Sequence, residues 1–214
     1  MLWDMDGLLV DSEPLWSVAE EQLAAALGGV WSEQLKAAIV GTRLDVAVPL
    51  VLEHYGHPTD PATVAETSSW LLARMVDLFA AEPPVLPGVS GLLREVAALG
   101  VPQALVSSSY RVLVDAVLQH GLGPFAVTLA GDEVEHGKPH PEPYLTAAAR
   151  LGVDPAACVV LEDSAAGVLS AEAAGCAVVA VPSVVGVTVV ETQRTVVRRS
   201  LAEVSEGLLR ELVR

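Results

Sequence analysis

The sequence has few basic residues. Its 214 residues include 12 Lys and Arg against 27 Asp and Glu, which gives a formal net charge of −15. A nucleic-acid-binding protein needs a basic surface, and an anionic membrane attracts basic segments. The charge balance therefore argues against both partners. An acidic protein that handles an anionic ligand needs positive charge placed locally, from a metal ion or from individual Lys and Arg side chains.

Cysteines and long apolar runs are also scarce. Cys158 and Cys176 lie in apolar stretches with no close Cys/His spacing, so we expect buried free thiols in a reducing cytosol rather than a disulfide or a metal site. The N-terminus lacks a basic region followed by an apolar one, so no secretory signal is expected. The longest uncharged run, 173–190, contains two glycines and a proline, which favours strand and loop over a membrane span.

The chain is long and apolar enough for a sizeable core, because 52% of its residues are hydrophobic. Residues 13–82 carry helical patterns. Apolar residues recur at helical spacing over 15–27, and Thr59-Asp60-Pro61 is a typical helix start. The predicted helices of this segment are 15–27, 32–40, 43–55 and 61–81. We therefore expect an all-helical segment between a first strand at 2–9 and a proline-rich linker at 83–88.

After the linker, helices and strands alternate. The predicted helices are 89–99, 110–120, 141–151 and 165–174, and the predicted strands are 101–106, 126–130, 158–161 and 177–181. The strands are apolar without alternation, which indicates a parallel sheet covered on both faces. The predicted fold is α/β, with a three-layer αβα Rossmann-like core at 1–12 and 83–214. An all-helical cap domain at 13–82 is inserted after the first strand. The segment 184–200 matches no pattern.

The predicted strands end in polar residues. The ends, or the loops that follow them, carry Asp4-Met5-Asp6-Gly7, Ser107-Ser108-Ser109, Gly137-Lys138-Pro139 and Glu162-Asp163-Ser164. Each piece alone has an ordinary interpretation as a turn, a helix cap or a solvated loop. Parallel strands place their carboxyl ends at one edge of the sheet, where ligands bind. Four carboxylates there would repel one another, and oxygen-only ligands favour Mg²⁺ as the compensating cation.

These four motifs, in this order and spacing, resemble those of the haloacid dehalogenase superfamily of phosphohydrolases. The helical insertion resembles the subgroup with a small α-helical cap, which includes β-phosphoglucomutase, phosphoglycolate phosphatase and 2-deoxyglucose-6-phosphate phosphatase. The resemblance implies that Asp4 is the nucleophile that forms an aspartyl-phosphate. It implies that Asp6 is the general acid and then the base that activates water.

The resemblance also implies roles for the remaining motif residues. Ser107 would hold a phosphoryl oxygen, and Lys138 would neutralise charge between the phosphate and the nucleophile. Asp163 would bind Mg²⁺ together with Asp4 and the backbone carbonyl of Asp6, and Glu162 would assist directly or through water. Catalysis of phosphoryl transfer consists mainly of positioning and charge stabilisation, which these residue types supply.

Further residues are candidates for contact with the substrate. Gly7 and Ser108 belong to the motifs themselves. Arg43 resembles the cap arginine of sugar-phosphate enzymes, Trp16 is a candidate for the entrance, and Arg111 follows the serine loop. Each of these three also has an ordinary alternative, as a surface arginine or a core tryptophan. Asp11 is interpreted as structural, near the cap hinge, and the five histidines form no metal spacing.

The second aspartate, Asp6, and the Glu162-Asp163 pair favour a Mg²⁺-dependent phosphatase over a true haloacid dehalogenase, which needs no metal. We expect a monomeric, cytoplasmic hydrolase of small phosphomonoesters, with a sugar or polyol phosphate as substrate. A phosphosugar mutase is the alternative, although Trp16 stands where such mutases carry a histidine. A regulatory phosphoacceptor module is an alternative of another class, but such modules are about half this length and lack the helical insertion.

Overall fold

The structure is a computed structural model that describes residues 1–39, 42–80, 83–183 and 189–213. Its centre is a parallel sheet with the strand order β3-β2-β1-β4-β5-β6. The strands are β1 (Leu2–Trp3), β2 (Ala104–Val106), β3 (Val127–Leu129), β4 (Val159–Glu162), β5 (Ala177–Ala180) and β6 (Thr195–Val197). The first strand of the chain therefore lies in the middle of the sheet, between β2 and β4.

Both faces of the sheet are buried, which explains why the strands are apolar without alternation. Successive side chains of a strand point to opposite faces. In β2, Leu105 therefore packs on one face while Ala104 and Val106 pack on the other. The first face is covered by α5 (Val89–Ala98), α6 (Arg111–Leu118) and α9 (Glu206–Leu212), and the second by α7 (Glu142–Leu151) and α8 (Ala165–Ala173). This arrangement confirms the predicted three-layer αβα fold.

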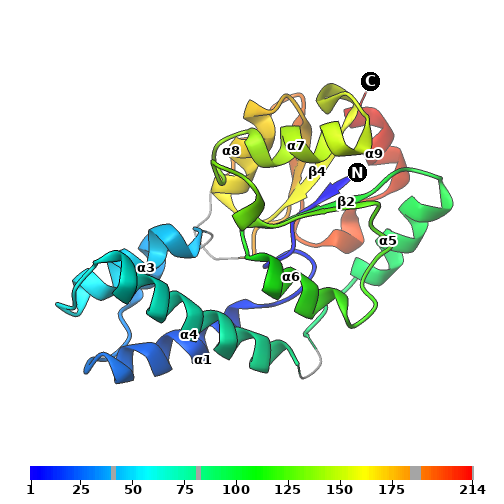
Figure 1. Cartoon of the computed structure of the whole chain (residues 1–214). Coiled ribbons are helices and arrows are strands. Elements are labelled where there is room, and N and C mark those ends of the chain that lie inside the picture. The colour runs from blue at the N-terminus through cyan, green and yellow to red at the C-terminus, as the bar shows by residue number, and fades with distance from the viewer. Residues whose placement is uncertain (40–41, 81–82, 184–188, 214) are drawn as a thin grey trace.

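The helices α1 (Glu13–Ala26), α2 (Glu33–Ile39), α3 (Leu44–His54) and α4 (Pro61–Phe79) form what we call the helical block. Figure 1 shows this block at one end of the molecule, apart from the sheet, with α4 next to α6. The α4 start is the one expected: the Asp60 carboxylate accepts hydrogen bonds from the backbone N–H groups of Ala62 and Thr63. Among the described residues, no helix has the length and apolarity needed to cross a bilayer.

The helical block shares one hydrophobic cluster with the first face of the sheet. The cluster runs from Leu23 in α1 and Leu71 in α4, through Leu113 in α6, to Trp3 and Leu105 in the sheet. The two chain segments that join the block to the sheet also lie together. The Asp11 N–H donates to the Pro84 carbonyl at 2.8 Å and the Leu86 N–H donates to the Leu9 carbonyl at 2.9 Å. The exact cap boundaries, 13 and 82, stay a prediction.

Several elements differ from the sequence-based expectation. The strand expected over 2–9 is only two residues long, because the N–H groups of Leu9 and Val10 turn back to the Met5 carbonyl. The strand expected at 101–106 begins at Ala104. The strand β6 and the helix α9 were not predicted. The expected helix ends at 40 and 81, and part of 184–200, lie outside the described residues. Cys158 and Cys176 are buried free thiols, as predicted.

Candidate active site

The strand ends meet at one edge of the sheet, as their parallel pairing requires. Trp3 is in register with Leu105 on one side and with Leu161 on the other. The residues that follow are therefore neighbours, and the Asp4 N–H donates to the Leu161 carbonyl at 3.0 Å. The predicted juxtaposition of the four motifs is present in the structure.

The Lys138 ammonium links three of these strand ends. It donates to Asp4 Oδ1 at 2.7 Å, to Glu162 Oε1 at 2.6 Å and to the Val106 carbonyl at 3.0 Å. The side chain is almost fully buried, and its ammonium lies 5.0 Å from the centre of the Tyr144 ring. Burial alone lowers a lysine pKa, but the Asp4 and Glu162 carboxylates raise the pKa of Lys138 well above its ordinary value. The ammonium is therefore a permanent charge beside Asp4.

Both oxygens of the buried Glu162 carboxylate are occupied. Oε1 accepts from Lys138 and, at 2.9 Å, from the Tyr144 hydroxyl. Oε2 accepts from the N–H groups of Asp163 and Ser164, each at 2.9 Å, and from the Ser164 hydroxyl at 3.0 Å. A Cβ at Gly167 would overlap this carboxylate, so only glycine fits at this position near the start of α8. In this arrangement Glu162 positions Lys138 and the loop that carries Asp163.

Three hydroxyl groups hold the Asp6 carboxylate. Ser12 Oγ donates to Oδ1 at 2.8 Å, and the hydroxyls of Ser107 and Ser109 donate to Oδ2 at 3.1 and 2.8 Å. Ser107 thus contacts Asp6 directly, and its Oγ accepts from the Ser109 N–H at 2.9 Å. This network fixes the orientation of Asp6 at the edge of the sheet.

Three acidic residues come close enough to share a metal ion. Asp4, Glu162 and Asp163 each offer one carboxylate oxygen, and these oxygens lie within 4.8 Å of one another. Such hard oxygen donors fit Mg²⁺. Gly7 makes the close approach possible: its φ of +79° suits glycine, and a Cβ there would overlap the Asp163 carboxylate. The hydroxyl of Ser183 also donates to Asp163 Oδ2.

The acidic cluster carries more negative charge than Lys138 alone can balance. Burial raises the pKa of Asp4 well above its ordinary value; Lys138 opposes this, and the carboxylates of Glu162, Asp163 and Asp6 add to it. Burial, followed by the Glu162 carboxylate, raises the pKa of Asp163 to about 7. A buried group with such a shift is stabilised in its charged form by an added cation. The charge balance therefore agrees with the donor set in favouring a divalent cation.

A cavity extends from this edge of the sheet to the helical block. On the sheet side it is lined by Asp4, Asp6, Ser108, Ser109, Tyr110, Lys138 and Asp163. On the helical side it is lined by apolar side chains of all four block helices, together with Trp16, Trp31, Glu13 and Glu20. Trp16 and Ser108 are thus at the cavity, where the sequence-based prediction put them. Their contact with a substrate stays a prediction.

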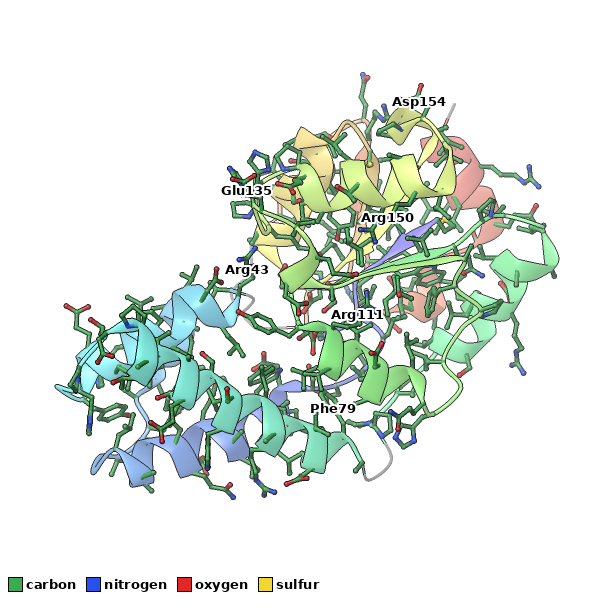
Figure 2. All side chains as sticks on the ribbon, viewed as in Figure 1. Arg43, Phe79, Arg111, Glu135, Arg150 and Asp154 are labelled. Atoms are coloured by element: carbon green, nitrogen blue, oxygen red, sulfur yellow. The ribbon has the colours of Figure 1, made fainter. Side chains whose placement is uncertain are left out.

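Two of the predicted substrate contacts, Arg43 and Arg111, form hydrogen bonds and ion pairs with other parts of the protein. The Arg43 guanidinium pairs with Asp45 and donates to the carbonyls of Val134 and Glu135 at 3.0 and 3.3 Å. Figure 2 shows Arg43 at the end of the helical block that faces Glu135. Neither Arg43 nor Arg111 is among the residues that line the cavity.

Arg111 is held away from the cavity by three partners. Its guanidinium pairs with Glu133 and Asp115 and donates to Thr128 Oγ1 at 3.0 Å. The predicted substrate contacts of Arg43 and Arg111 remain untested, but in this structure each arginine ties two protein segments together. Asp11 is exposed, and its backbone N–H bonds to Pro84 where the two segments that join the helical block to the sheet lie together. This position agrees with its structural interpretation.

Several site residues were missed from the sequence. Four hydroxyl groups donate to the carboxylates of the site: those of Ser12 and Ser109 to Asp6, that of Tyr144 to Glu162 and that of Ser183 to Asp163. Only Ser109 had a signal, as part of the serine run after a strand. The others lie far along the chain from their partners or beside a turn whose path the sequence does not reveal.

Residues 1–175 match the haloacid dehalogenase-like hydrolase family. The chain belongs to this family. Among curated relatives, it is 35% identical over 189 residues to hexitol phosphatase B of Escherichia coli K12, an alignment that covers 85% of this chain and 82% of the relative. Both the predicted family and the prediction of a hydrolase are confirmed.

Solved structures of the family have the same architecture. CbbY from Rhodobacter sphaeroides, solved in complex with phosphate, superposes with a TM-score of 0.84 and 28% identity, covering 94% of each chain. A β-phosphoglucomutase from Clostridium difficile superposes with a TM-score of 0.83 over 99% of this chain and 95% of that one. At 21% identity, the latter shows the fold alone. Both matches confirm the predicted α/β fold.

Proposed function

We propose that this haloacid dehalogenase-like hydrolase is a Mg²⁺-dependent phosphatase of small phosphomonoesters, with a sugar or polyol phosphate as substrate. One observation carries the proposal. At the cavity, Asp4 is bonded to a buried ammonium, and Asp6, two residues further on, is oriented by three hydroxyls. The similarity to hexitol phosphatase B supports a phosphorylated polyol or sugar as substrate.

The two aspartates divide the chemistry. An Asp4 oxygen attacks phosphorus, a new bond forms between them, and the bond from phosphorus to the leaving oxygen breaks. Asp6, protonated at that stage, gives its proton to the leaving oxygen, which departs as an alcohol. Asp6 then takes a proton from water, and the resulting hydroxide attacks phosphorus. The bond between phosphorus and the Asp4 oxygen breaks, phosphate leaves, and the Asp4 carboxylate is regenerated.

The surrounding residues stabilise charge. Lys138 lies beside the attacking carboxylate and compensates negative charge that develops on the phosphoryl group. Asp4 and Asp163 would hold Mg²⁺, which supplies further positive charge to the phosphoryl oxygens. Both Glu162 oxygens already accept hydrogen bonds, so this residue suits a contact to the ion through water. Ser107 would hold a phosphoryl oxygen, and its hydrogen bond to Asp6 Oδ2 would orient Asp6.

The experiment is phosphate release from a panel of phosphomonoesters, measured with Mg²⁺ and with EDTA. The panel contains hexitol phosphates, sugar phosphates and p-nitrophenyl phosphate. We expect metal-dependent release, fastest for one polyol or sugar phosphate. Release that is equal in EDTA would contradict the metal requirement. Conversion of β-glucose 1-phosphate to glucose 6-phosphate without release would establish the mutase alternative.

The nucleophile is tested by Asp4→Asn, with Asp11→Asn as a matched control on an exposed aspartate of the same segment. We expect Asp4→Asn to lose activity by about 10³-fold or more while the fold is kept. Asp11→Asn should keep full activity. Retained turnover in Asp4→Asn would remove Asp4 from the nucleophile role.

A further inference from the structure

The helical side of the cavity contains two buried polar atoms that have no hydrogen-bond partner among the described residues. Glu20, on α1, is only 8% exposed, and its Oε2 is buried without a hydrogen bond among the described residues. The same holds for the indole Nε1 of Trp31. Both residues line the cavity that also contains Asp4 and Asp6. One is an acceptor and the other a donor, and both belong to the wall opposite the strand ends.

Unpaired buried polar groups are costly, and native proteins leave few of them. Glu20 is doubly unfavourable because a buried carboxylate also loses its hydration. Burial raises its pKa from 4.5 to about 7; Lys36 opposes the shift, and Glu13 and Glu33 add to it. Two such groups on one cavity wall indicate that a ligand completes their hydrogen bonds.

The charges of the cavity restrict what that ligand can be. Among the lining residues that the structure describes, Lys138 is the cation, and it is already bonded to Asp4 and Glu162. The helical side offers Glu13 and Glu20, with apolar side chains such as Val48 and Leu71 around them. Lys36 on α2 pairs with Glu13 at 3.3 Å but does not itself line the cavity. Among the described residues that line this wall, none carries a positive charge to balance a second phosphate or a carboxylate on the substrate.

We propose that Glu20 and Trp31 are specificity-determining residues that bind hydroxyl groups of the leaving alcohol. They therefore select neutral polyhydroxylated leaving groups over anionic ones. One substrate hydroxyl donates to the Glu20 carboxyl group, and the oxygen of another accepts from the Trp31 indole N–H. A hydroxyl both donates and accepts, so a polyol satisfies both groups at once. The inference rests on the proposed phosphatase function and narrows its substrate class.

The test compares kcat/KM for a hexitol phosphate, a sugar bisphosphate and p-nitrophenyl phosphate. The variants are Glu20→Leu, which removes the acceptor, Trp31→Phe, which removes the N–H, and the conservative Glu20→Gln. Glu21→Gln is the control, because Glu21 is the exposed neighbour on α1. The aryl phosphate has no hydroxyls to bind, so it reports on the phosphoryl chemistry alone.

We expect the wild type to prefer the hexitol phosphate to the bisphosphate. Glu20→Leu should lower kcat/KM for the hexitol phosphate by about 10- to 100-fold, as for a lost hydrogen bond to a charged group. Trp31→Phe should lower it by about 5- to 10-fold, as for a neutral hydrogen bond. Glu20→Gln should recover part of the loss, and the aryl phosphate should change by less than about threefold in every variant.

Three results would overturn the proposal. The first is an equal loss on the hexitol and aryl phosphates, which would assign Glu20 and Trp31 a structural role. The second is no loss on either substrate. The third is a wild-type enzyme whose kcat/KM for the bisphosphate equals or exceeds that for the hexitol phosphate. Absence of turnover on all three substrates in the wild type with Mg²⁺ is a different result. It would refute the phosphatase function itself, and the inference with it.

Discussion

The two walls of the cavity differ in how completely their polar groups are paired. On the sheet side, every polar side-chain atom of Lys138 and Asp6 is hydrogen-bonded, and no described lining residue there has a buried polar side-chain atom without a partner. On the helical side, Glu20 and Trp31 each have a buried polar atom without a partner in the part of the chain that the structure describes. The sheet wall is organised for a group that is the same in every phosphomonoester. In the proposed function, the helical wall binds the part of the substrate that varies.

Lys138→Met should have the largest effect on the sheet side, because it removes the ammonium that bonds Asp4 and Glu162. Loss of the ammonium leaves buried carboxylates uncompensated and removes the charge beside Asp4, so activity should fall by about 10²- to 10³-fold. The measurement is kcat for p-nitrophenyl phosphate at saturating Mg²⁺. Arg94→Met, on an exposed position of α5, is the control and should stay fully active. Activity within tenfold of the wild type would show that Lys138 is dispensable.

The next effect is that of Gly7→Ala. The added Cβ overlaps the Asp163 carboxylate, and the positive φ is unfavourable for alanine. Activity should fall by about 10- to 100-fold. Gly56→Ala is a matched control, because Gly56 has a φ of +72° but nothing within 4 Å of its Cβ position. Both variants should lose about 1 kcal/mol of stability from backbone strain, but only Gly7→Ala should lose activity. Equal activities would contradict the overlap argument.

Glu20→Gln tests the helical side through the pH dependence of stability. The folded-state pKa of about 7 exceeds the ordinary 4.5, so the folded protein binds more protons than the unfolded chain between these values. The unfolding free energy therefore decreases as pH rises through that window. Glu20→Gln lacks this penalty and should be more stable than the wild type above pH 7, by about 1–2 kcal/mol. The two should be alike near pH 4.5.

Urea unfolding at pH 4.5, 6 and 8 measures this difference. Glu21→Gln should follow the wild type at each pH because its side chain is exposed. A stability gap between Glu20→Gln and the wild type that does not change with pH would show that Glu20 is not titrating in this window.

The smallest effect is that of Tyr144→Phe. The hydroxyl that donates to Glu162 Oε1 at 2.9 Å is lost, while the ring over Lys138 remains. Because Lys138 still bonds the same oxygen, the variant should lose about 1 kcal/mol of stability and less than about fivefold in kcat. Thermal unfolding and kcat measure the two quantities. A loss as large as that of Lys138→Met would mean that the hydroxyl, not the ammonium, holds the network.

The sequence predicts the sheet side of the site better than the helical side. Asp4, Ser107 and Glu162 each follow an apolar strand, and parallel pairing brings such strand ends together whatever the loops do. The residues Ser12 and Tyr144 escaped prediction because their contacts depend on a turn and on a helix position that only the folded chain defines. The sequence shows which residues these are, but not which residues they contact in the folded chain.

Long-range packing also explains the other differences. Glu20 lies among apolar residues of α1, but its burial depends on how the four helices pack. The substrate contact of Arg43 stays a prediction, but its bonds to two backbone carbonyls of the loop before Lys138 could not be foreseen from the sequence. The strand β6 has only three residues, and its pairing with β5 rather than its own pattern makes it a strand.

The hydrophobic cluster that joins the helical block to the sheet makes the block unsuitable as an exchangeable module. Leu71 of α4 and Leu113 of α6 belong to the same continuous core, so excision of residues 13–82 would expose the apolar surface of α6. A chimaera that carries a foreign cap must therefore reproduce the α6-facing side of α4 as well as the cavity wall. Substrate range in this chain is more readily altered by substitutions inside the cavity than by transplanting the helices.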